Sequence, residues 1–198
     1  MKHSSLVLIL AIAVAFASGQ EKKGAPPGTE EMMKKMMELG APGEHHKKLD
    51  ALVGSWETTM SMWMEGPGKP PARSKGSAEF RWVLGGRYLV QEVKGMMMGM
   101  PMNGIGYNGY DNLRKKYTMF WIDDMGTVMS TGDGNYDASG KVLTLYGKMD
   151  DPTTDEYDKN VKYVTRWVGD NTFVFEMYDL AIGGADTKVM EINYERTK

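Results

Sequence analysis

The side chains best suited to chemistry in this sequence are methionines gathered in one short segment, residues 96–102. Five of its seven residues are Met, and a thioether sulfur is a soft ligand that suits Cu(I). On a β-strand, Met98, Met100 and Met102 would share one face and present three sulfurs together. The segment therefore supports one hypothesis of function, a protein that handles Cu(I).

The same segment also has a plainer interpretation as apolar packing. Met is flexible and polarizable and fills irregular apolar gaps, while Pro101 favours a loop or an edge strand over a central one. Met60, Met62 and Met64 form a second alternating stripe in phase with Trp56, so an inward Trp56 would place them inward as well. These patterns favour a lid or lining over an apolar cavity, and we rank that above a copper site.

Other reactive side chains are scarce. His45 and His46 are adjacent, whereas a metal site needs three or four donors, so a surface or capping role is expected for both. Cysteine is absent, which excludes thiol catalysis, and no Ser stands in a Gly-x-Ser-x-Gly elbow. We therefore expect no cofactor, no metal bound by these residues and, on balance, no enzyme, with an enzyme of unidentified type as the second alternative.

Two carboxylates stand at strand positions where they could face a ligand or a partner. Asp123 follows Trp121 at strand spacing and is expected to face inward with Tyr107. A buried carboxyl has a raised pKa unless it is paired, and a hydrogen-bonded core carboxylate is favoured here over a role in orienting a ligand. Arg166 and Glu176 share one face of the last hairpins, where an exposed cross-strand ion pair is expected.

The N-terminus predicts export. Lys2 and His3 precede an apolar run from Leu6 to Phe16 that ends in a small-x-small pattern, as in a secretory signal peptide over residues 1–19. Residues 20–28 are charged and rich in Pro and Gly, which predicts a flexible leader. No later stretch reaches the roughly 20 apolar residues of a membrane span. The expected location is the periplasm or the extracellular space.

Charge excludes one class of partner. Removing Lys2 with the signal peptide leaves 24 − 1 = 23 basic and 26 acidic residues, a formal charge of 23 − 26 = −3. Nucleic-acid binding needs clustered Lys and Arg, so no nucleic-acid partner is expected. The oligomeric state is left open.

A helical segment is expected over residues 29–53. Thr29 can act as an N-cap, and Met32, Met36 and Leu39 recur at helical spacing. We expect this helix to lie against one end or side of the following domain, because its apolar stripe must be covered. One or two further helical turns are expected over residues 44–52.

From Gly54 the pattern changes to period two, which predicts β-strands. Ten runs separated by turn residues are expected at 55–64, 76–84, 87–95, 103–110, 116–123, 127–136, 141–149, 160–168, 172–179 and 187–196. Ten sequential strands with short connections predict an all-β fold, a single antiparallel up-and-down β-barrel over residues 54–198. A barrel of this size can hold one small ligand.

Several motifs resemble those of known barrel families. Gly54-Ser55-Trp56 at the start of the first strand resembles the G-x-W motif of lipocalins and related calycin barrels, in which an Arg near the end of the barrel packs over the Trp. The chain from Pro42 to Arg196 resembles an exported bacterial domain-of-unknown-function family, number 1579, with a lipocalin-like barrel. The further residues that carry this resemblance are Pro42-Gly43, His45, Leu49, Met97-Met98-Gly99-Met100-Pro101, Gly109-Tyr110-Asp111-Asn112, Trp121-Ile122-Asp123 and Phe175-Glu176-Met177-Tyr178. The resemblance implies a fold and brings no activity.

The leading hypothesis is a binding module that holds a small apolar or amphipathic molecule inside the barrel. Its expected inward set is aromatic and rich in Met, as ligand pockets usually are. The candidate ligand-binding residues are Met60, Met62, Phe80, Trp82, Met98, Met100, Tyr107, Met119, Trp121, Asp123, Tyr163, Trp167 and Phe175. Trp56 and Arg196 are the candidate structural pair, joined by a cation–π contact.

Overall fold

The computed structural model describes residues 28–197 except 67, 152–153 and 181–185. The chain begins with three short helical elements and continues as ten strands. The helical elements are α1 (Thr29–Gly40), α2 (Glu44–Lys47) and the 3-10 helix η1 (Lys48–Leu52). The strands are β1 (Gly54–Met62), β2 (Ala72–Val83), β3 (Tyr88–Met97), β4 (Met100–Asp111), β5 (Lys116–Asp123), β6 (Ser130–Tyr136), β7 (Val142–Asp151), β8 (Glu156–Gly169), β9 (Thr172–Asp179) and β10 (Thr187–Arg196).

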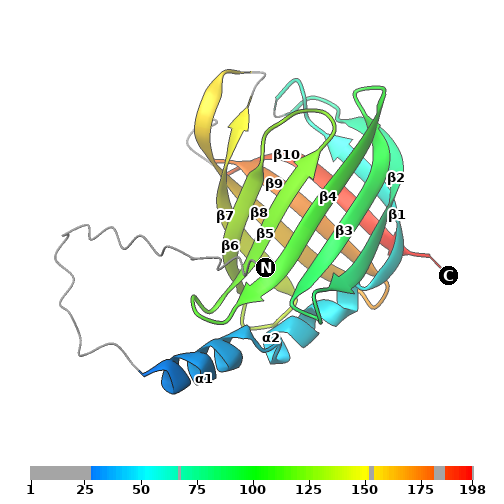
Figure 1. Ribbon diagram of the computed structural model, residues 1–198. Helices are drawn as coiled ribbons and strands as arrows, with labels where there is room; N and C mark the ends of the chain where they lie inside the picture. Colours follow the sequence, from blue (N-terminus) through cyan, green and yellow to red (C-terminus); the bar gives the residue numbers. More distant parts are fainter. Residues whose placement is uncertain (1–27, 67, 152–153, 181–185, 198) are drawn as a thin grey trace, which may run out of the picture.

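The ten strands form a closed antiparallel barrel (Figure 1). Each strand pairs with its neighbour in sequence, and β1 closes the barrel by pairing with β10 in a register that sets Trp56 opposite Arg196. The predicted all-β, up-and-down barrel of about ten strands is therefore confirmed. Closure pairs every strand on both sides over at least part of its length.

Every second residue of a strand faces the inside of this barrel. In β1, for example, Trp56 and Thr58 are buried and Ser55 and Glu57 are exposed, which is the period of two expected of a strand with one wet face. The helical elements α2 and η1 lie at one end of the barrel (Figure 1). We call the half of the barrel next to them the lower half, and the half at the opposite end the upper half.

Aromatic rings fill the lower half. Trp56 is 0% exposed and lies edge-on to Phe173, with 4.8 Å between ring centroids. Phe173 in turn stacks on Tyr194 at 4.2 Å. The Trp56 indole Nε1 donates a 2.8 Å hydrogen bond to the Leu52 carbonyl of η1, so the ring's one polar atom is satisfied although it is buried.

Arg196 covers the bottom of this core. Its guanidinium carbon lies 4.1 Å from the centroid of the Trp56 ring. Its two terminal nitrogens donate 2.6 Å hydrogen bonds to the carbonyls of Val53 and Ala51. One side chain from the last strand therefore ties the first strand to η1, and the cation–π contact expected from the G-x-W pattern has this geometry.

The Met-rich segment forms a tight hairpin between β3 and β4. Met97 pairs with Met100, and the two residues between them, Met98 and Gly99, both have positive φ, at 51° and 79°. This is the backbone of a type I′ hairpin turn. The predicted loop is therefore only this two-residue turn, and Pro101 lies opposite Met96 in a paired hairpin arm.

The first helix is present as predicted but not covered. Met32, Met33, Met36 and Met37 are all 48–72% exposed, and α1 projects away below the barrel (Figure 1). Its C-terminal end is held by Asn112, whose side-chain nitrogen donates to the carbonyls of Leu39 and Ala41. The expectation that the Met stripe packs against the barrel was wrong.

The signal peptide and leader expected over residues 1–19 and 20–28 lie outside the described residues, apart from Gly28. Across the part of the chain that the structure describes, no helix combines the length and apolar character needed to cross a membrane.

Candidate functional site

The barrel wall opens in its upper half, between β2 and β3. Pairing between these two strands stops at Ser77 and Lys94. Beyond that point β2 stays paired with β1 as far as Ala72, and β3 stays paired with β4 as far as Met97. The two strands therefore lie near each other without a hydrogen-bonded ladder, and side chains line a gap between them.

Two glycines flank this gap. A Cβ added to Gly76 would lie 2.5 Å from the Lys94 carbonyl oxygen and 2.9 Å from Thr58 Oγ1, so only glycine allows the backbones to approach so closely here. A Cβ added to Gly95 would meet nothing closer than 3.7 Å. A Cβ at Gly95 would therefore be in ordinary van der Waals contact with the backbone of Gly76 and Lys75, without a clash.

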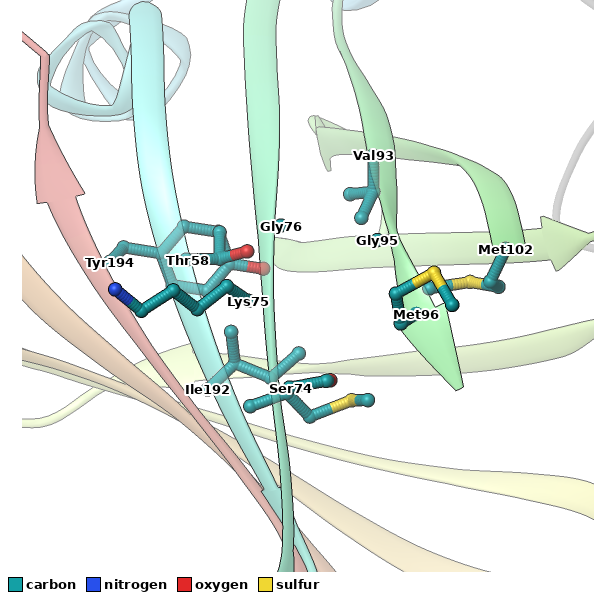
Figure 2. A pocket seen from close by; sticks show the side chains of 11 residues that line it. Thr58, Ser74, Lys75, Gly76, Val93, Gly95, Met96, Met102, Ile192 and Tyr194 are labelled. Carbon is teal, nitrogen blue, oxygen red and sulfur yellow. The ribbon is translucent and has the colours of Figure 1, made fainter. Parts of the chain in front are cut away.

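The opening is shallow, with a cavity volume of about 20 Å³, roughly the space of one water molecule. Figure 2 shows its lining side chains coming from β1, β2 and β10 on one side and from β3 and β4 on the other. The lining is mostly apolar, with hydroxyl groups among it, as in small-molecule sites. The lining residues are Thr58, Met60, Ser74, Lys75, Gly76, Val93, Gly95, Met96, Met102, Ile192 and Tyr194.

The inner wall of the upper half is rich in methionine and stays partly exposed. These side chains lie against the buried core and yet are not fully covered, so solvent reaches them inside the barrel. Met can change rotamer at low cost and adapts its shape to a partner. The partly exposed residues of this kind are Met97, Met119, Trp121, Met149, Phe175 and Met177.

Trp121 and Asp123 form a satisfied pair within this wall. The Trp121 Nε1 donates a 2.8 Å hydrogen bond to Asp123 Oδ2, and the Met125 backbone N–H donates to Asp123 Oδ1 at 3.0 Å. The Trp121 ring covers Gly104, where an added Cβ would lie 2.2 Å from the ring. Both oxygens of Asp123 are therefore engaged in fixing the ring and the following turn.

A buried ion cluster occupies another part of the upper half. The Lys159 side chain is 7% exposed, and its ammonium lies 2.7 Å from Glu156, 2.8 Å from Asp179 and 3.0 Å from Asp151. Burial lowers the pKa of Lys159, but the hydrogen bonds to these three carboxylates outweigh it and hold the pKa above its usual range. The ammonium thus stays charged, and its three protons have partners.

Three predicted ligand residues belong to the packed lower half. Phe80 is buried against Phe173 and Tyr194. Trp82 donates from Nε1 to Asp50 at 2.7 Å, and Trp167 lies 5.3 Å from Phe173 between ring centroids. These rings face inward, but they lie in the packed end of the barrel and not at the opening.

Of the remaining predictions, Met60 lines the opening and Met62 follows it on the same face of β1. Tyr163 and Phe175 face the interior, with nearly parallel rings 6.1 Å apart. Met119 lies in the partly exposed upper wall. These five residues are thus brought to the upper half.

Three of the predicted residues are exposed. Tyr107 is 40% exposed on the outer wall beside Phe120, because Gly104 and Gly106 are the residues of β4 that face Asp123 and Trp121 in the register. Met98 is in the hairpin turn and is 58% exposed. Met100 shares a face of β4 with Met102, as predicted, but it is half exposed at the strand end and Met102 is buried.

Sequence reasoning missed most of the lining on β2, β3 and β10. Thr58 was identifiable because it shares the parity of Trp56 and Met60, and Ile192 because it shares that of Arg196. Nothing in the sequence marked Gly76 and Gly95 as lining residues, because their position at the opening depends on where the hydrogen-bonded ladder between β2 and β3 ends.

The two histidines are structural in the lower half. The Gly43 N–H donates to His46 Nδ1 at 3.1 Å, and burial lowers the pKa of His46, with the nearby charges of His45 and Arg87 acting in the same direction. His45 stacks on Tyr110 at 4.1 Å. No group of three or more His, Cys, Asp or Glu side chains able to hold a metal is found among the described residues.

One protein family and several solved structures resemble this chain. A family model described as "Protein of unknown function (DUF1579)" matches residues 41–196. No curated protein matches the chain. The Rv2717c crystal structure from M. tuberculosis is similar at 18% identity with a TM-score of 0.58, covering 80% of this chain and 100% of that one. This likeness shows the fold alone.

Two redesigned or engineered β-barrels solved with the ligand DFHBI are more distant. EF1p2_mFAP2b is 12% identical with a TM-score of 0.40, covering 77% of this chain and 98% of that one. The redesigned barrel mFAP0 is also 12% identical, with a TM-score of 0.39, covering 74% of this chain and 99% of that one. At these scores neither likeness bears on what this chain binds.

Proposed function

This chain belongs to the DUF1579 family of proteins of unknown function, and we propose from its own geometry that it is an exported binding protein for a small apolar or amphipathic molecule. The ligand lies in the upper half of the barrel and reaches it through the opening between β2 and β3. The barrel fold is one that can hold a small ligand at this strand number.

The observation that carries this proposal is the mostly apolar, methionine-lined opening in the barrel wall. Its cavity volume is only about 20 Å³, roughly the space of one water molecule, so a ligand enters by displacing side chains. The flexible side chains of Met60, Met96 and Met102 line the opening, so the space can widen when a ligand displaces them.

A substitution that fills the opening tests the proposal. The probe is N-phenyl-1-naphthylamine, a neutral fluorophore that brightens in apolar surroundings. Gly95 lines the opening, and in Gly95→Leu the new Cβ would come no closer than 3.7 Å to the backbone of Gly76 and Lys75, so it adds bulk there without a clash. Thr59→Leu is the matched control, because Thr59 is exposed on the outer face of β1.

We expect the parent to bind the probe and Gly95→Leu to bind it at least about tenfold more weakly, which is about 1.4 kcal/mol. Thr59→Leu should bind it as the parent does. The proposal fails if the parent takes up no probe, or if Gly95→Leu and Thr59→Leu bind it equally while both remain folded by circular dichroism.

Cu(I) handling is the second candidate, favoured by one observation. Met60, Met96 and Met102 line the same opening, and three thioethers are a donor set that suits Cu(I). If Cu(I) is the ligand, Met102→Leu should lower Cu(I) affinity in competition with a chelator and leave probe uptake intact. Our first proposal expects no tight Cu(I) binding by the parent.

Export is supported by the N-terminal pattern of Lys2 and His3 followed by the apolar run from Leu6 to Phe16. We expect the mature protein to begin near Ser18 or Gln20 and to be found in the periplasm or the medium. Mass spectrometry of the intact protein recovered from fractionated cells measures this. A cytoplasmic, uncleaved chain would contradict it.

A further inference from the structure

Tyr163 is held rigidly inside the barrel. It lies on β8, is 4% exposed, and pairs with Leu145 of β7 and Met177 of β9. Its ring is nearly parallel to that of Phe175, with 6.1 Å between ring centroids, and a Cβ added to Gly132 would be 3.1 Å from the Tyr163 ring. The ring therefore has little freedom to turn, and its hydroxyl has a fixed place.

That hydroxyl has no hydrogen-bond partner among the described residues, and no other buried side-chain oxygen or nitrogen in that part of the chain is left so. Burial raises the pKa of Tyr163, and the side chain of Ser130 offsets this rise without meeting the hydroxyl at hydrogen-bond geometry. The group is therefore a neutral O–H donor, and leaving it unpaired in an apolar interior costs free energy.

Other buried polar side chains of the barrel do have hydrogen-bond partners within the chain. Tyr194, buried in the lower core, accepts a 3.1 Å hydrogen bond from Gln91, and Trp56 donates to Leu52. Buried polar side chains are almost always paired. An exception on a rigid ring calls for a partner that binds from outside the chain.

Tyr163 is not one of the residues that line the opening. It lies on the opposite wall, because β8 is across from β2 and β3 in the strand order of the barrel, so a ligand that enters through the opening meets it only by crossing the interior. Ser130 begins β6 at its upper end, which directs the Tyr163 hydroxyl toward the upper half. Met119 and Met177, both partly exposed, lie in this part of the wall.

We propose that the Tyr163 hydroxyl donates a hydrogen bond to a carbonyl oxygen of the bound molecule. The inference rests on the proposed function and names the ligand class: a neutral, compact apolar molecule with one carbonyl group. Met119, Phe175 and Met177 cover the apolar body, and Tyr163 fixes its orientation.

A charged ligand fits this place poorly. Apart from Ser130, the neighbours of Tyr163 named above are apolar, and a carboxylate buried among them without a cation would have a large desolvation cost. Lys159, the buried cation of the upper half, already has three carboxylate partners. The site thus selects a neutral acceptor.

The test uses two naphthalenes that differ in one group, 2-acetylnaphthalene with a carbonyl and 2-ethylnaphthalene without one. Affinities for the parent and for Tyr163→Phe are measured by calorimetry. We expect Tyr163→Phe to weaken 2-acetylnaphthalene about fivefold to tenfold and to leave 2-ethylnaphthalene unchanged. The infrared carbonyl band of bound 2-acetylnaphthalene should be lowered in the parent and not in the variant.

A merely structural role predicts a different result. If the hydroxyl had a partner within the chain, Tyr163→Phe would lower the thermal midpoint of the free protein, as expected for Tyr194→Phe, which removes the bond to Gln91. We expect Tyr163→Phe to keep or raise the midpoint.

The outcomes separate the two proposals. If the parent binds neither naphthalene, the proposed function fails and this inference fails with it. If the parent binds both and Tyr163→Phe weakens neither, or weakens both equally, only this inference is overturned. A lowered midpoint in Tyr163→Phe with unchanged carbonyl band also overturns it.

Discussion

The two halves of the barrel are built from different side chains on the same strands. In the lower half, Trp56, Phe173 and Tyr194 are fully packed, and their polar atoms and those of Arg196 have partners inside the chain. In the upper half, methionines line the wall, many stay partly exposed, and the Tyr163 hydroxyl has no partner among the described residues.

The stiffness of the side chains in each half explains how the two halves should differ in stability and adaptability. Aromatic rings have few rotamers and large contact areas, so the lower half fixes the strand register and closes the barrel. Met has three rotatable bonds before its terminal methyl group, so the upper half can repack around a guest molecule. Stability should therefore be concentrated in the lower half and adaptability in the upper half.

The largest effect should come from exchanging a tryptophan in each half. Trp56→Ala should cost about 3–5 kcal/mol, because a fully buried ring is lost and leaves a cavity. Trp121→Ala should cost at most about 2 kcal/mol, because that ring is partly exposed and buries less apolar area. Urea denaturation followed by circular dichroism measures both.

Equal costs for the two tryptophan variants would show that the halves do not differ in stability. A larger cost for Trp121→Ala would reverse the comparison and place the stable core in the upper half.

Much of the fold was predictable because strand periodicity and turn chemistry are local signals. The eight residues from Lys116 to Asp123 form β5 with the bounds expected from their alternation, and β9 and β10 also keep theirs. Closure followed from the number of strands. The contact of Trp56 with Arg196 was inferred from the G-x-W resemblance, which links a residue near the start of the barrel sequence to one near its end.

The candidate site was less predictable because it depends on register. Tyr107 was placed on the wrong face, since one residue of register decides which side chains of β4 face Trp121. The exposed Met32 and Met36 show a second limit: an amphipathic stripe predicts a helix but does not say whether this chain covers it. The opening beside Gly95 exists because the ladder between β2 and β3 ends there, and the sequence does not show where a ladder ends.

Removing Arg196 tests how the lower half is closed. Arg196→Ala loses two hydrogen bonds, to the carbonyls of Val53 and Ala51, and should cost about 1.5–3 kcal/mol. Arg81→Ala is the control, because its ion pair with Glu92 is exposed and should contribute less than about 1 kcal/mol. If chemical denaturation gives the same loss for both, Arg196 does not close the lower half.

Two glycines test how each half accepts added bulk. A Cβ at Gly104 would meet the Trp121 side chain at 2.2 Å, while a Cβ at Gly134 would meet the Thr144 carbonyl oxygen at 2.0 Å. We expect Gly104→Ala to cost about 1 kcal/mol, since a side chain in the upper half can move, and Gly134→Ala to cost about 3 kcal/mol or more.

Thermal midpoints and tryptophan emission check this pair. The emission of Trp121 should shift in Gly104→Ala, because its ring is displaced, and should stay unchanged in Gly134→Ala. A cost for Gly104→Ala that matches or exceeds that for Gly134→Ala would mean that the upper wall is as rigid as the lower one.

The smallest effect concerns pH and the lower half. Burial, followed by the charges of His45 and Arg87, lowers the pKa of His46 below its ordinary value of 6.5. As the pH falls below 6.5, the unfolded chain takes up a proton at His46 before the folded chain does, so stability is lost toward acid pH and is fully present above 6.5.

His46→Gln keeps an acceptor for the Gly43 N–H and removes this titration. Between about pH 7.5 and pH 5.5 the parent's unfolding midpoint should therefore drop more than that of His46→Gln. An equal drop in both would show that acid sensitivity arises elsewhere, and a smaller drop in the parent would contradict the burial of His46 in the packed end.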